Sequence, residues 1–91
     1  MTITKELTLV NKYGMHVRPA GALAKVCQKY ACDVTVENAG TSVSGKSVLG
    51  LMTLEAPVGT VLTVTAAGDD ADLAMAEIEE LVLNHVGIAD E

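Results

Sequence analysis

The sequence NKYGMHVRPA at residues 11–20 marks the point where the chain changes from a strand pattern to a helical one. In residues 2–10, apolar and polar side chains alternate, which is typical of a β-strand with one buried face. From Val17 to Ala31, apolar residues recur at the spacing of a helix with one buried stripe. Pro19 fits only in the first turn of that helix, where the N–H that proline lacks would have no partner. The stretch therefore predicts a strand, a loop and a helix that begins near residues 16–18.

Turn and capping residues divide the rest of the chain into five further elements. The patterns predict strands at 33–37, 41–44 and 60–67, a short apolar helix at 48–54 and a last helix at 71–84. Ser47 is expected to cap the short helix, Gly87 to close the last one, and residues 88–91 to form a loose tail. The order βαββαβα predicts one α+β domain over residues 1–91, in which helices cover one face of a single sheet.

The composition narrows the class of protein. Of the 91 residues, 49% are hydrophobic, yet none is Phe or Trp, so we expect an aliphatic core. The net charge of −6 argues against binding to nucleic acid, which needs a basic face. No apolar run reaches the ~18 residues of a membrane span, and the N-terminus lacks the apolar centre of a signal peptide. These features predict a soluble, cytoplasmic protein that binds neither nucleic acid nor membrane.

The charges are unevenly distributed along the chain. Residues 1–46 contain all six Lys and Arg residues and three acidic ones, whereas residues 47–91 contain nine acidic residues and no Lys or Arg. Two interpretations remain open. The charges form ordinary solvated faces, or the basic half presents a working site to an acidic partner.

The two cysteines, Cys27 and Cys32, are separated by four residues. This is not the spacing of a CxxC redox motif, and no second pair completes a zinc site, so we expect two buried free thiols and no bound metal. The sequence also lacks a glycine-rich P-loop and a nucleophile at catalytic spacing from a base. It therefore predicts a group carrier without a cofactor rather than an enzyme.

His16 and Arg18 carry the predicted chemistry. The first N–H groups of a helix lack internal partners and carry about half a positive charge, so a helix N-terminus can bind an anion such as phosphate. Arg18, the only arginine, can add a forked, permanent charge for phosphate oxygens. A neutral imidazole beside these groups can accept a phosphoryl group covalently. The alternative is an ordinary surface histidine, which is our interpretation of His85.

Two segments, GMHVRPA at residues 14–20 and GKSVLGLMTL at residues 45–54, make the sequence resemble the histidine-containing phosphocarrier proteins (HPr) of the bacterial phosphoenolpyruvate-dependent phosphotransferase system. The resemblance extends over nearly the whole chain. It implies an open-faced β-sandwich, in which a four-stranded antiparallel sheet is covered on one face by three helices. It also implies a carrier in sugar transport: phosphorylated Enzyme I transfers its phosphoryl group to Nδ1 of His16, Arg18 stabilises the phosphate, and EIIA domains receive it. A nitrogen-branch regulatory paralogue is the alternative within the family.

The short apolar helix predicts a docking surface. One face of so short a helix can bury only two or three residues, and the remainder forms an exposed patch that suits several partners in turn. The residues assigned to the core are Leu51 and Leu54. The resemblance implies that a surface of Val48, Leu49, Met52, Val17 and Gly21 binds Enzyme I and the EIIA domains. The alternative is that this patch packs under neighbouring loops.

Ser47 corresponds to the serine that an HPr serine kinase/phosphatase modifies in some members of the family. A phosphate there would lie at a helix N-terminus and be tolerated, and the alternative is a plain N-cap. A function of a different class also remains open, namely a binding module that acts through phospho-Ser47 and the apolar short helix. Tyr13 stands where family members often have a small polar residue. We expect the protein to act as a monomer.

Overall fold

The computed structural model describes residues 1–84 of the chain. Its elements are β1 (Thr2–Thr8), α1 (Val17–Gln28), β2 (Asp33–Asn38), β3 (Thr41–Ser44), α2 (Val48–Thr53), β4 (Val61–Ala67) and α3 (Ala71–Leu83). This is the order that the sequence predicts. The expectations for His85, Gly87 and the tail at 88–91 lie outside the described residues.

The four strands form one antiparallel sheet in the order β1-β4-β2-β3. β4 lies between β1 and β2. In the register of β1 and β4, Leu7 is paired with Leu62. β2 and β3 form a hairpin whose two turn residues, Ala39 and Gly40, have φ angles of 51° and 85°. Positive φ at both central residues is what a tight two-residue hairpin turn requires.

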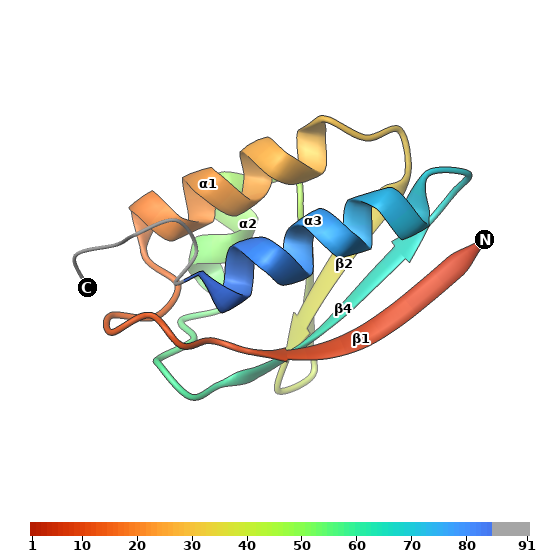
Figure 1. Cartoon of the computed structure of the whole chain (residues 1–91). Helices are drawn as coiled ribbons and strands as arrows, with labels where there is room; N and C mark the ends of the chain where they lie inside the picture. The colour runs from red at the N-terminus through yellow and green to blue at the C-terminus, as the bar shows by residue number, and fades with distance from the viewer. Residues whose placement is uncertain (85–91) are drawn as a thin grey trace.

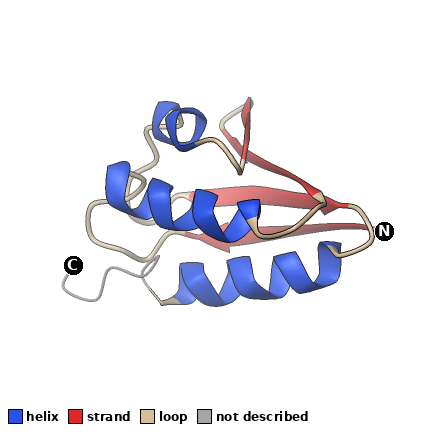
Figure 2. Cartoon of the chain, turned by 90° about the horizontal axis from the view of Figure 1, so that it is seen from above, coloured by secondary structure: helices blue, strands red, loops and turns tan. Residues whose placement is uncertain are grey.

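All three helices cover the same face of the sheet (Figures 1 and 2). The core between the two layers is aliphatic. Its largest fully buried side chains include Leu9, Leu23, Leu51, Leu62 and Ile78. Polar side chains outside the core include Thr4 and Thr65, whose hydroxyl groups are 3.1 Å apart and hydrogen-bonded between β1 and β4. The predicted open-faced α+β sandwich is therefore confirmed.

α1 ends at Gln28 rather than at Ala31, because the residues that follow it bond to distant parts of the chain. Nζ of Lys46 donates to the carbonyl oxygen of Tyr30 (2.8 Å). The carboxylate of Asp70 accepts a hydrogen bond from the backbone N–H of Ala31 (2.9 Å). These partners lie outside any local sequence pattern, so the pattern overextended the helix.

The burial of two side chains of α3, Met75 and Leu81, does not follow from the sequence pattern. Ala74, Ile78 and Val82 are buried, and so is Met75, whereas Leu81 is only partly buried. Met75 lies one turn before Ile78, so it continues the stripe that faces the sheet. Leu81 instead lines the groove between α3 and α1.

Candidate functional site

The loop between β1 and α1 is held by the loop that precedes β4. The N–H of Leu9 donates to the carbonyl oxygen of Thr60 (2.9 Å), and the N–H of Met15 donates to the carbonyl oxygen of Ala56 (2.8 Å). Leu9 and Met15 are themselves buried. The backbone that leads into α1 is therefore anchored at both ends of the loop.

Gly14 makes the turn of this loop possible. Its φ angle is 68°, in the left-handed region that favours glycine. A Cβ atom at this position would overlap the carbonyl oxygen of Ala56 and lie 2.8 Å from Cα of Pro57. The carbonyl oxygen of Gly14 accepts a hydrogen bond from the side-chain amide of Asn11 (2.6 Å), which is fully buried. Backbone conformation and close packing both require glycine here.

His16 occupies the N-cap position of α1. Its backbone is extended (φ −106°, ψ −170°), and its side chain makes no capping hydrogen bond. Its carbonyl oxygen accepts the first helical hydrogen bond, from the N–H of Ala20 (2.9 Å). Because Pro19 has no N–H, the donors that the first turn presents to an anion are the N–H groups of Val17 and Arg18. The half-buried imidazole therefore stands at the positive end of the helix.

Two cationic side chains and one aromatic side chain lie within four residues of His16 in the sequence. Arg18 is exposed in the first turn of α1. The ring of Tyr13 meets the imidazole nearly at a right angle (78°), with 6.2 Å between the ring centroids. Nζ of Lys12 lies over the ring of Tyr13, 5.2 Å from its centroid. The loop thus places an aromatic ring against the predicted nucleophile and a lysine against that ring.

Ser47 caps α2, as the sequence predicts. Its Oγ accepts a hydrogen bond from the backbone N–H of Gly50 (3.0 Å). Gly50 is also a position of close approach, since a Cβ there would lie 3.2 Å from Cβ of Val43 in β3. α2 lies beside the first half of α1 (Figures 1 and 2). The second sequence segment and His16 are therefore at the same end of the molecule.

Three of the five residues expected in the docking surface are exposed, and the other two are partly buried. Val48 is partly buried and packs against the core. It is therefore less exposed than the sequence predicts, because Val48 lies one turn before the buried Leu51, on the same side of α2. The exposed fractions are 76% for Leu49, 37% for Met52 and 57% for Val17. Gly21 is half-buried, with open space where a side chain would be.

Charges from the two halves of the sequence meet at α3. Nζ of Lys5 lies 3.0 Å from the carboxylate of Glu79, and Lys29 forms an ion pair with Glu77. The hydroxyl group of Tyr30 also donates to Glu77. Hydrogen bonds from Lys29 and Tyr30 lower the pKa of this carboxyl group. The charge separation along the sequence is thus partly neutralised in the fold.

Cys27 and Cys32 are free and buried, as predicted. Burial raises the pKa of the Cys27 thiol to about 12, so this thiol is a weak nucleophile at neutral pH. Among residues 1–84, no three His, Cys, Asp or Glu side chains are grouped so that they could hold a metal ion. In the same part of the chain, every helix is too short or too polar to cross a membrane.

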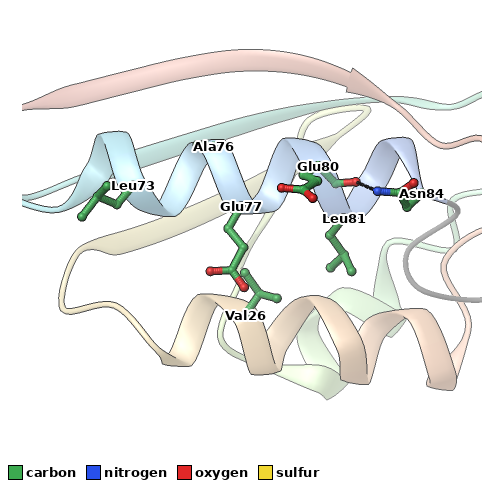
Figure 3. A pocket seen from close by; sticks show the side chains of 7 residues that line it. All are labelled: Val26, Leu73, Ala76, Glu77, Glu80, Leu81 and Asn84. Atoms are coloured by element: carbon green, nitrogen blue, oxygen red, sulfur yellow. Dashed lines mark hydrogen bonds between the residues drawn. The ribbon is translucent and has the colours of Figure 1, made fainter.

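A groove of about 510 Å³ lies between α1 and α3 (Figure 3). It is lined by Val26, Leu73, Ala76, Glu77, Glu80, Leu81 and Asn84. His16 and Arg18 are not among its residues. The predicted chemistry therefore belongs to an exposed loop and not to this groove, an arrangement that suits a group passed between proteins better than the enclosure of a small molecule.

Sequence analysis did not identify Asn11 or the contacts of Lys12 and Tyr13. Asparagine is a common turn residue, so its type hinted at the loop. The loop that contains it, however, is held by backbone hydrogen bonds to Ala56 and Thr60, more than forty residues further along the chain. A lysine next to a tyrosine has no periodic signal at all. Only the folded loop brings these side chains together near the imidazole.

Known proteins resemble this chain over almost its full length. A family model described as "PTS HPr component phosphorylation site" matches residues 3–84. Phosphocarrier protein HPr of Borreliella burgdorferi is 40% identical over 80 residues, which cover 88% of this chain and 93% of that protein. Phosphocarrier protein NPr of Shewanella violacea is 35% identical over 80 residues, which cover 88% of each chain. The crystal structure of HPr-C-His from Thermoanaerobacter tengcongensis has a TM-score of 0.89 at 29% identity and covers 93% of this chain and 96% of that one.

Proposed function

Because the chain belongs to the HPr family of phosphocarrier proteins of the phosphotransferase system, we propose that His16 accepts a phosphoryl group from phosphorylated Enzyme I and donates it to EIIA domains. In the first transfer, a bond forms between an imidazole nitrogen, Nδ1, and phosphorus, while the bond between phosphorus and Enzyme I breaks. In the second, the EIIA domain attacks the same phosphorus atom and His16 is the leaving group. The carrier is regenerated, and no cofactor takes part.

One observation supports this role above the others: His16 occupies the N-cap of α1, at the positive end of the helix. The N–H groups of Val17 and Arg18 would donate to the phosphoryl oxygens. The guanidinium group of Arg18 would add a permanent positive charge beside them. The transferred group carries its negative charge on these oxygens throughout, so fixed donors and cations stabilise it.

The test is labelling with phosphoenolpyruvate and Enzyme I, followed by phosphorus NMR. We expect one acid-labile phosphoryl group on the wild-type chain and none on His16→Ala. Circular dichroism of the variant confirms that the fold is retained. An acid-labile group on the folded His16→Ala variant would show that another residue is the acceptor.

We propose that one surface meets Enzyme I and the EIIA domains, formed by Val48, Leu49 and Met52 of α2 together with Val17 and Gly21 of α1. Support comes from the exposure of Leu49, Met52 and Val17, and from the position of α2 beside the first half of α1. Leu49→Ala should raise the KM of Enzyme I for the carrier. Leu73→Ala on α3, also exposed (61%), is the matched control and should leave KM unchanged. An equal effect of both variants would contradict this surface.

Ser47 is proposed as a regulatory phosphorylation site for an HPr serine kinase/phosphatase. A phosphate on its Oγ would lie at the N-terminus of α2, near the surface that contains Leu49 and Met52. Incubation with the kinase and ATP should label the wild-type chain at an acid-stable site and leave Ser47→Ala unlabelled. The binding-module alternative makes a different prediction: its partner would bind His16→Ala as well as wild type but would lose affinity for Ser47→Asp.

The nitrogen branch is a second candidate, because a protein named NPr is among the relatives. Purified donors and acceptors of each branch would distinguish the two, since the cognate pair should give the higher kcat/KM. We also propose that the carrier acts in the cytoplasm as a monomer. Size-exclusion chromatography with light scattering tests the second point, and a dimer at micromolar concentration would contradict it.

A further inference from the structure

In the loop before α1, the ring of Tyr13 contacts both the imidazole of His16 and the ammonium group of Lys12. The centroids of the Tyr13 and His16 rings lie 6.2 Å apart with an interplanar angle of 78°. This is the edge-to-face arrangement that aromatic rings prefer at centroid separations of about 4.5–7 Å. The ammonium group of Lys12 lies 5.2 Å from the centroid of Tyr13, within the roughly 6 Å range of a cation–π interaction. Two consecutive contacts thus connect a cation, an aromatic ring and the imidazole.

The backbone beneath these side chains is fixed, although the side chains themselves are exposed. Tyr13 is 63% exposed, so its ring contributes little to the core. Its neighbours are different: Asn11 is fully buried, Gly14 packs against the Ala56 carbonyl group, and Met15 is 5% exposed. Because these residues are held in place, the directions in which Tyr13 and His16 project from the backbone are set by the fold.

We propose that Tyr13 is a positioning residue for the phosphoryl site, a role that rests on the proposed function of His16. Its ring limits rotation of the imidazole and so keeps the accepting nitrogen directed at the incoming phosphorus. The same ring holds the Lys12 ammonium group near the site, where it adds a second cation to that of Arg18. Transfer depends steeply on the alignment of the attacking atom, so an imidazole that leaves this orientation would react more slowly.

A positioning role and a docking role make different kinetic predictions. If Tyr13 only touched Enzyme I, its removal would raise KM and leave kcat nearly unchanged. If it orients the imidazole, its removal lowers kcat and leaves KM nearly unchanged. Tyr13→Phe keeps the ring and removes the hydroxyl group, so it should restore what Tyr13→Ala loses.

The first measurement uses the unphosphorylated full chain and does not depend on transfer. In proton NMR, the His16 ring signals should shift when Tyr13→Ala removes the neighbouring ring, and should stay close to wild type in Tyr13→Phe. Leu73→Ala, which changes a side chain of similar exposure on α3, should leave these signals unchanged. Equal unfolding midpoints for the three variants would confirm that the fold is intact.

The second measurement is steady-state transfer from phosphoenolpyruvate through Enzyme I to the carrier. For Tyr13→Ala we expect kcat to fall about fivefold with KM within about twofold of wild type, and for Tyr13→Phe we expect both values near wild type. Lys12→Met should lower transfer about twofold at low salt and less at high salt, whereas the control Lys25→Met, on α1, should have no effect.

The possible failures are distinguishable. If the wild-type chain accepts a phosphoryl group at His16 and Tyr13→Ala matches it in ring signals and in kcat, the positioning role is wrong and the carrier function stands. A change in KM alone would make Tyr13 a docking residue, and equal losses in Tyr13→Ala and Tyr13→Phe would assign the effect to the hydroxyl group; both overturn the proposal. If the wild-type chain accepts no phosphoryl group, the carrier function and the positioning role are both wrong.

Discussion

Gly14→Ala is predicted to lower the free energy of unfolding by about 3 kcal/mol. An alanine in the left-handed conformation of Gly14 (φ 68°) costs about 1–2 kcal/mol. Its Cβ would also overlap the Ala56 carbonyl oxygen, so the two loops must separate. That movement breaks the hydrogen bond from Met15 to Ala56, which contributes about 1 kcal/mol. Since a domain of this length has roughly 5–13 kcal/mol of stability, the variant should still fold.

Gly59→Ala is the matched control for this prediction. Gly59 also has a positive φ angle (88°), but a Cβ there would meet no atom within 4 Å. It should therefore cost only the conformational part, about 1–2 kcal/mol. Urea titrations of both variants, compared at equal m-values, measure the difference of about 1–2 kcal/mol that close packing adds. If Gly14→Ala is no less stable than Gly59→Ala, the two loops do not approach each other as described.

Three further predictions concern other parts of the fold. Ser47→Ala should cost about 1 kcal/mol in a urea titration, since the N–H of Gly50 loses its acceptor, while Ser47→Asp should remain near wild type. The hydrogen bond from the backbone N–H of Ala31 holds the pKa of Asp70 below its usual value of 3.8. Its stabilising effect is therefore present at neutral pH and is lost as pH falls through the lowered pKa, so Asp70→Asn should reduce the loss of thermal stability in acid. The raised pKa of Cys27, about 12, predicts that iodoacetamide at pH 8 modifies this thiol only after unfolding, and fast modification of the native protein would contradict its burial.

The order of the elements could be predicted because it depends on local signals. The hairpin between β2 and β3 has its turn where Ala39 and Gly40 stand, and α2 begins directly after its capping serine. The order of the strands in the sheet is different, because it depends on how the chain crosses over between them. The same limit applies to the end of α1, where the carboxylate of Asp70 and the side chain of Lys46 bind the chain after the helix.

The position of His16 could be predicted because a single residue type determines it: Pro19 restricts where α1 can begin. The partial burial of Val48 could not be predicted, because a six-residue helix is too short for periodicity to show which side faces the core. The contact between Tyr13 and His16 was equally inaccessible. Two residues separate them, and the conformation of one of these, Gly14, determines whether the rings meet.

A residue that exchanges a group with two proteins in turn must be accessible and yet held in a fixed direction. A deep pocket would supply the fixed direction but would exclude the partner. In this fold, the buried residues Asn11, Gly14 and Met15 fix the backbone next to the site. His16 itself is half-buried, and Arg18 is exposed. It follows that changes in the buried anchors should act mainly on the rate of transfer, and changes on the exposed surface mainly on partner affinity. The two loops that pack beneath the site are therefore as much a part of the carrier's design as the residues that would touch phosphorus.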